Sequence, residues 1–129
     1  MAQARFRILR HRPDGTGTAG SGRVSWRLLA TNNRDLGRAP TTYPDPGACR
    51  TAVLWLQRHI ADLRIEIVRT GPSTWSWRIM AAATVVAQSS RDYQRRIQAD
   101  QAATTAVDLI PSAELVGLDL GDGLTRPRR

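Results

Sequence analysis

Three arginines and two serines are the side chains best placed to bind a ligand. They lie in short segments in which apolar and polar residues alternate, such as Val24-Ser25-Trp26-Arg27-Leu28. Residues two apart in a β-strand share a face, so these polar side chains lie opposite the apolar ones. Guanidinium groups bind carboxylates and phosphates, and hydroxyls add further donors. The first interpretation of such a face is an ordinary solvated surface, and the functional interpretation is a docking surface for a phosphate-bearing or acidic partner. Its residues are Arg7, Arg27, Arg78, Ser25 and Ser76.

Catalytic chemistry has less support in the sequence. His11 and His59 have no obvious partner, and Cys49, the only cysteine, falls on the apolar side of a predicted helix. A reactive cysteine needs a nearby base and a lowered pKa, and the sequence indicates neither. The Asp and Glu residues show no metal-ligand spacing. We therefore expect a protein that is not an enzyme and that has no metal and no cofactor.

A glycine-rich segment formally matches a nucleotide-binding motif. Residues 15–20 read Gly-Thr-Gly-Thr-Ala-Gly, the spacing of the dinucleotide fingerprint. That fingerprint requires a strand before the glycines and a helix after them, because the helix N-terminus holds the pyrophosphate. Here a predicted strand follows, so we interpret residues 12–23 as a flexible loop.

The chain repeats itself once. Residues 24–30 return as residues 75–81 at an offset of 51, and Tyr43 returns as Tyr93 at an offset of 50. The second copy has therefore lost one residue in the turn between these two features. Two copies are too few for a solenoid, which needs about three stacked units. An internal pseudo-dimer is the natural interpretation, and we expect a monomer with an internal pseudo-two-fold axis.

Periodicity predicts the same elements in both copies. Alternation predicts strands over residues 6–9, 24–30 and 35–38, and over 65–68, 75–81 and 85–88. Asn32-Asn33 suits a tight turn, since Asn tolerates positive φ. Asp45 and Pro46 suit the start of the first helix, and Pro111 ends the second. The apolar side of the first helix consists of Cys49, Ala52, Val53, Leu56, Ile60 and Leu63, and that of the second of Ala99, Ala102, Ala103, Ala106, Leu109 and Ile110.

Two β-β-β-α repeats with one apolar sheet face each predict an α+β fold. We expect one domain over residues 1–118, with repeat one at about 4–63, repeat two at about 64–118, and a flexible tail at 119–129. Trp26 and Trp77 would be equivalent core residues rather than a base-stacking platform. The expected architecture is an antiparallel sheet with both helices on one face.

The repeated motif resembles that of the YegP-like family. The first copy reads Trp26-Arg27-Leu28-Leu29-Ala30-Thr31-Asn32-Asn33, followed by Tyr43, and the second reads Trp77-Arg78-Ile79-Met80-Ala81, followed by Tyr93. Asn33 and Ala83-Thr84 depart from the usual Asn-Gly turn. The resemblance covers about residues 4–116. It implies that the two units form a single, largely antiparallel sheet. It also implies that the strand after each helix pairs with the other unit, so that residues 113–118 cross back to the first repeat. It implies no biochemical activity.

The charge of the chain leaves a second function open. The 19 basic residues are all arginine, and the net charge is +8. Such a charge is compatible with a nucleic-acid-associated protein that uses the arginine-studded sheet face, and solubilising surface charge is the alternative. No apolar run is long enough to span a membrane, and no signal peptide is visible. We expect a cytoplasmic protein that acts as a binding or interaction module.

Overall fold

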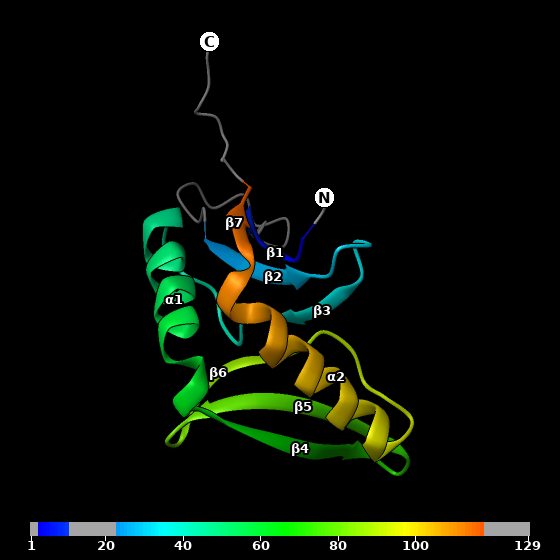
Figure 1. Ribbon diagram of the computed structural model, residues 1–129. Coiled ribbons are helices and arrows are strands. Elements are labelled where there is room, and N and C mark those ends of the chain that lie inside the picture. The colour runs from blue at the N-terminus through cyan, green and yellow to red at the C-terminus, as the bar shows by residue number, and fades with distance from the viewer. Residues whose placement is uncertain (1–2, 11–22, 118–129) are drawn as a thin grey trace, which may run out of the picture.

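The protein, described here from a computed structural model, consists of two successive sets of three strands and a helix (Figure 1). The structure describes residues 3–10 and 23–117. The predicted glycine-rich loop and flexible tail lie outside these residues. The first set is β1 (Arg5–Arg10), β2 (Val24–Leu29), β3 (Asp35–Arg38) and α1 (Pro46–His59), and the second is β4 (Arg64–Gly71), β5 (Thr74–Ala81), β6 (Thr84–Ser89) and α2 (Arg96–Leu109). A 3-10 turn ends each helix, and β7 (Glu114–Val116) follows the second.

All seven strands form one sheet in the order β4-β5-β6-β3-β2-β1-β7. The two sets meet at β3 and β6, which pair antiparallel, so the six-strand part has corresponding strands in the same order from either edge. Among the strands that the structure describes, only the β1–β7 pair is parallel. The α+β fold and its single, largely antiparallel sheet are thus confirmed. The exchanged strand is confirmed as well, because β7 follows the second helix and pairs with β1 of the first set.

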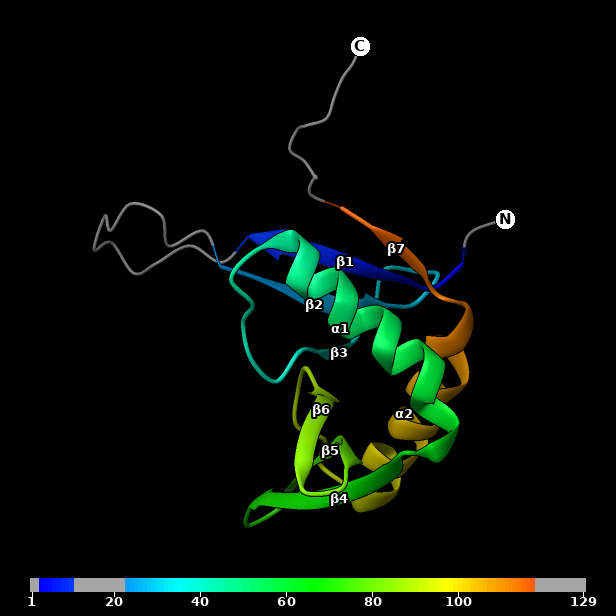
Figure 2. The same ribbon diagram turned by 90° about the vertical axis from the view of Figure 1, so that its left-hand side faces the viewer.

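Both helices lie on one face of the sheet, whose halves curl around them (Figure 2). The alternating strand residues that face the helices form the core, in which Trp26 and Trp77 are each 1% exposed. Their predicted burial is confirmed. The ring of Phe6 meets that of Trp26 edge to face at 5.1 Å. Because the apolar side chains are used on this face, the opposite face of the sheet keeps the polar ones.

The first helix begins, and both helices pack, as their sequences predict. The side chain of Asp45 accepts a hydrogen bond from the backbone N–H of Ala48 at 2.8 Å, which caps α1. In α2, the Gln98 side chain accepts a bond from the Arg95 N–H at 3.2 Å. The residues that each helix buries fall on the predicted apolar sides. In α1 they are Cys49, Val53 and Leu56, and in α2 Ala99, Ala103 and Ala106.

The turn after the second strand differs between the two sets. In the first set, Asn33 adopts φ 69° and closes the turn with a bond to the Ala30 carbonyl at 2.9 Å. In the second set, the turn is one residue shorter, and Ala82 adopts φ 54°. The predicted turn at Asn32-Asn33 is confirmed. The lost residue accounts for the change of offset from 51 to 50.

One glycine explains how the two sets fit together at the centre. A Cβ on Gly37 of β3 would lie 2.8 Å from Cη2 of Trp77 and 3.0 Å from the Gln88 carbonyl oxygen. Such contacts are closer than ordinary packing permits. Gly37 thereby lets the Trp77 ring of the second set pass beneath a strand of the first. The corresponding residue in β6 is Ala87, which is 1% exposed.

Candidate functional site

Arginines form a row across the outer face of the sheet. Strand register places Arg7 beside Arg27, Arg27 beside Arg38, Arg38 beside Gln88, and Gln88 beside Arg78. We call Arg7, Arg27, Arg38 and Arg78 the arginine row. Neighbouring strands lie about 4.8 Å apart, so adjacent members can reach a common ligand. Like charges directly opposite one another destabilise a sheet, which an anion on this face would relieve.

Carboxylates neutralise two members of the row. Arg27 pairs with Asp35 at 2.5 Å, and the other carboxylate oxygen of Asp35 accepts a bond from the Ser90 hydroxyl at 2.5 Å. Within the described residues, neither Arg7 nor Arg38 has an acidic partner at ion-pair distance. These two arginines therefore provide the uncompensated positive charge of the row.

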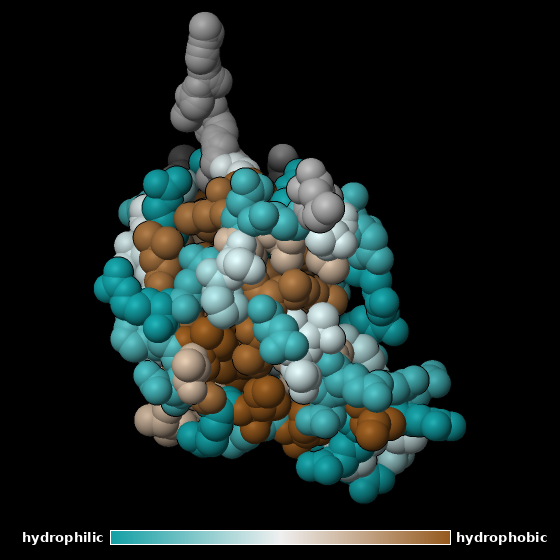
Figure 3. Space-filling view, viewed as in Figure 1, coloured by the Kyte–Doolittle hydropathy of each residue, from teal (hydrophilic) through white to brown (hydrophobic). Residues whose placement is uncertain are grey.

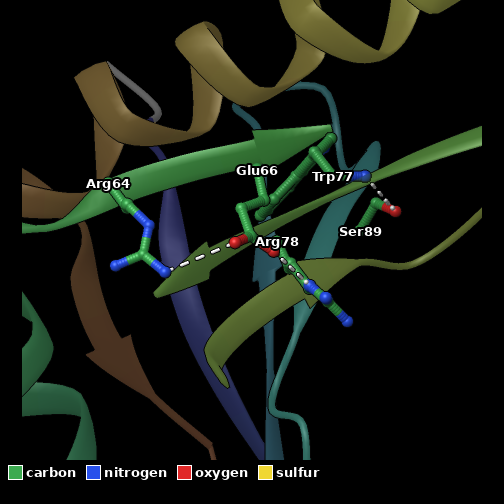
Figure 4. A network of polar contacts seen from close by, with 5 residues as sticks. All are labelled: Arg64, Glu66, Trp77, Arg78 and Ser89. Atoms are coloured by element: carbon green, nitrogen blue, oxygen red, sulfur yellow. Dashed lines mark hydrogen bonds and ion pairs between the residues drawn. The ribbon is translucent and has the colours of Figure 1, made fainter. Parts of the chain in front are cut away.

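At the other end of the row, Glu66 accepts bonds from two arginines (Figure 4). Nε of Arg78 lies 3.0 Å from its carboxylate, and Nη2 of Arg64 lies 3.3 Å away. The bond from Arg78, together with that from Arg64, holds the pKa of Glu66 below its ordinary value, although desolvation opposes them. Exposed pairs of this kind contribute little to stability. Their effect here is to reduce the positive charge of the second set.

Two grooves flank the centre of the row. The first-set groove has a volume of about 410 Å³, and the second-set groove about 320 Å³. Arg38 and Gln88 lie in the walls of both grooves. The polar side chains of the first-set groove also include Arg10, Ser25, Arg27, Thr41 and Thr42, and those of the second-set groove Ser76, Arg78, Arg91 and Asp92.

The structure places all five predicted site residues on the outer face but divides them. Ser25 and Arg27 line the first-set groove, and Ser76 and Arg78 line the second-set groove. Arg7 stands in the row beside Arg27 but lines neither groove. The sequence prediction missed Arg38, which lies at the centre. Alternation would have placed Arg38 inward with the buried Leu36, but the register of β2 and β3 shifts between Leu28 and Leu29, and Arg38 lies on the outer face. Pairing across β3 and β6 shows that the two sets share it.

The other reactive residues of the described chain are poor catalytic candidates. Burial raises the pKa of the Cys49 thiol to about 12, so the thiolate is scarce at neutral pH. The ring of His59 stacks on that of Trp55 at 4.4 Å, and its Nδ1 lies 2.8 Å from the Trp55 carbonyl oxygen. His59 therefore has a partner that the sequence did not indicate. His11 lies outside the described residues. Among the described residues, no three His, Cys, Asp or Glu side chains are grouped as metal ligands.

The helix side of the molecule carries apolar surface instead. Hydrophobic side chains gather between the two helices (Figure 3). Leu54 and Trp55 of α1 are 47% and 41% exposed, and Trp55 borders a groove of about 550 Å³ beside Tyr43 and Val86. No helix of the described residues combines the length and apolar character needed to cross a membrane. The charged outer face remains the better candidate site, because its side chains specify the chemistry of a ligand.

Comparison with known proteins finds the same fold twice. No family model and no curated protein matches this chain. The solution NMR structure of a UPF0339 protein from Shewanella oneidensis matches with a TM-score of 0.72 and 10% identity, over 90% of this chain and 92% of that one. The structure of yegP from E. coli, a protein of unknown function, matches with a TM-score of 0.70 and 11% identity, over 91% and 94%. The chain has the fold of the YegP-like proteins. This likeness concerns the fold alone, so function has to be argued from the outer face.

Proposed function

We propose that this YegP-like protein is a small, non-enzymatic binding module of the cytoplasm. Its outer sheet face docks an acidic or phosphate-bearing partner through the arginine row. The observation that carries the proposal is the cross-strand register, which sets four arginines in one line over five neighbouring strands, with only Gln88 between them. A ligand that spans the row contacts several guanidinium groups at once. Arginine suits this role because its planar fork of donors matches carboxylate and phosphate oxygens.

The rigidity of the sheet supports this role. The row is built on paired strands rather than on loops, so its side chains start from fixed positions. The same strands bury Trp26 and Trp77 on the opposite face. Binding therefore requires little ordering of the backbone, which lowers its entropic cost.

The nucleic-acid alternative rests on the net charge of +8. Single-stranded nucleic acid is usually held by aromatic side chains on which bases stack. In the described strands, the outward register positions hold no aromatic residue, since Phe6, Trp26, Trp75 and Trp77 all alternate with outward ones. Nucleic acid on this face would be bound through its phosphates alone, independently of sequence.

A paired charge-removal experiment tests the proposal. One variant carries Arg7→Gln and Arg38→Gln on the outer face. Its matched control carries Arg50→Gln and Arg58→Gln, two exposed arginines of α1. Both variants lose two positive charges, so only a site on the outer face distinguishes them. Titration with a fluorescent poly-glutamate peptide should show binding that falls at least about tenfold in the first variant and less than about twofold in the control.

Random-sequence DNA, used in place of the peptide in the same titration, tests the nucleic-acid alternative. If the DNA binds much more tightly than the peptide, weakens steeply with salt and requires Arg7 and Arg38, the partner is nucleic acid. Equal losses in both variants, or no saturable binding to either probe, would contradict a docking role for the face.

A further inference from the structure

The two outer grooves are built by corresponding residues that differ in charge. Thr42 of the first-set groove corresponds to Asp92 of the second, one residue before the equivalent tyrosines. Both positions are fixed in the same way, because Tyr43 and Tyr93 each form a backbone bridge to the start of the second strand of their set. A hydroxyl therefore occupies one groove where a carboxylate occupies the other.

Guanidinium groups surround the first-set groove. Arg10, Arg27 and Arg38 line it, and Arg23 lies at its rim, where Nε donates to the Thr42 hydroxyl at 2.6 Å and Nη2 to the Thr42 carbonyl at 3.0 Å. Asp35 neutralises Arg27. With Arg10 left out of the balance, three of these side chains, Arg23, Arg27 and Arg38, are cationic and Asp35 is anionic. The groove therefore retains excess positive charge beside the hydroxyls of Ser25 and Thr41.

The second-set groove has a smaller excess. It shares Arg38 and Gln88 with the first-set groove, and Glu66 pairs with its Arg78. Arg91 lies over the Tyr93 ring at 5.1 Å. The carboxylate of Asp92 is part of the groove wall. An anion that enters this groove meets a negative charge at the place where the first-set groove offers a hydroxyl.

We infer that the first-set groove is a binding site for a phosphate monoester. A monoester carries close to two negative charges at neutral pH and three acceptor oxygens. The carboxylate of Asp35 already pairs with Arg27 in this groove. A monoester offers the remaining guanidinium and hydroxyl donors three acceptor oxygens, so it matches them better than a second carboxylate does. The volume of about 410 Å³ leaves room for the group that carries the phosphate. This inference rests on the proposed function, because the groove adjoins the centre of the arginine row.

Backbone amide shifts in a ¹⁵N NMR titration locate the site. Glycerol 3-phosphate should produce saturable shifts at Ser25, Arg27, Thr41 and Thr42, and smaller ones at Ser76 and Asp92. Dimethyl phosphate, which has one negative charge and one fewer terminal oxygen, should bind at least about tenfold more weakly. A phosphoserine peptide and its unphosphorylated form identify the source of the phosphate. Tighter binding of the phosphopeptide in the same groove indicates a phosphoprotein, and equal binding indicates a small metabolite.

Thr42→Asp gives the first-set groove the charge of the second. It should lower the affinity for glycerol 3-phosphate at least about tenfold. The ¹⁵N NMR spectrum should still be that of the folded protein. Thr51→Asp on α1 is the control for an added carboxylate and should change the affinity less than about twofold. Shifts that do not saturate, that centre on the second-set groove, or that survive Thr42→Asp would overturn the phosphate site. If poly-glutamate binding still depends on Arg7 and Arg38, the proposed docking function stands although the phosphate site is refuted. If that dependence is also absent, both proposals fail.

Discussion

Trp26 and Trp77 occupy the same place in the two sets of strands, and each is 1% exposed. Thr42 and Asp92 also correspond, yet one adds a hydroxyl and the other a carboxylate to its groove. The inward positions agree because both sets fill one close-packed core, where a change of volume destabilises the fold. The outward positions meet water or a ligand and are free to differ. The differences between the sets therefore mark where function can reside.

The tryptophans should show the largest effects of substitution. Trp26→Ala and Trp77→Ala each remove a large side chain from the core, and each should lower the free energy of unfolding by about 3–5 kcal/mol. Urea denaturation followed by circular dichroism measures both. The equivalence of the two sets would be broken if one variant unfolded near the parent's midpoint while the other did not.

Loss of β7 should be the next largest effect, because only the first set has an added parallel strand. A chain that ends at residue 113 loses the pairing of Glu114–Val116 with β1 and the packing of Leu115 against the core. We expect a loss of about 2–3 kcal/mol and a tendency to aggregate, since the edge of β1 becomes exposed.

A chain that ends at residue 117 is the control for this truncation. It keeps all described contacts of β7 and should match the parent in thermal unfolding. Equal stability of the two truncated chains would refute a structural role for the exchanged strand.

The two tyrosines should differ although they correspond. Burial raises the pKa of Tyr43, and a hydrogen bond with the Trp26 side chain opposes this rise. The indole N–H can only donate, so Tyr43→Phe leaves it without its acceptor and should cost about 1–2 kcal/mol. In the described chain, Nε1 of Trp77 is buried and has no hydrogen-bond partner. Tyr93→Phe should therefore cost less than about 0.5 kcal/mol.

The unfolding midpoints of the Tyr43→Phe and Tyr93→Phe variants measure this contrast. Similar costs at Tyr43 and Tyr93 would show that the hydrogen bond to Trp26 contributes nothing specific to the first set.

The fold was predictable because its determinants are local and occur twice. Alternation around Trp26 and Trp77, the cap at Asp45 and the helical spacing from Cys49 to Leu56 each specify an element without reference to the rest of the chain. The path of the exchanged strand is not local. It came from the resemblance to the YegP-like proteins, and the pairing of β7 with β1 confirms it.

The candidate site was predictable only in part. Alternation identified which side chains of β2 and β5 point outward, but it could not show which strands are neighbours. The pairing of β3 with β6 brings Arg38 to the centre of the row, where both grooves share it. Ion pairs such as Arg27–Asp35 also depend on this register. Charge balance on a sheet face follows from long-range pairing, which periodicity does not contain.

The smallest expected effects concern the two turns. Ala82 adopts φ 54°, a left-handed conformation that costs a residue with a Cβ about 1–2 kcal/mol. Ala82→Gly removes this cost but adds entropy to the unfolded chain, so we expect a net gain of about 0.5 kcal/mol. Asn33 has a similar φ of 69°, but Asn tolerates it, and its side-chain oxygen accepts a bond from Arg5.

Asn33→Gly should therefore be neutral or slightly destabilising, although it introduces the same residue at the corresponding turn. Differential scanning calorimetry of both variants and of the double variant decides the sign of each change. The sites lie in different sets and share no described contact, so their effects should add. A gain at Asn33 equal to that at Ala82 would mean that the Arg5 bond contributes nothing, and a loss at Ala82 would mean that its turn is not strained. A gain in stability for Ala82→Gly together with a loss for Asn33→Gly would show that the second set carries the backbone strain of its one-residue deletion. The first set avoids that strain with an asparagine.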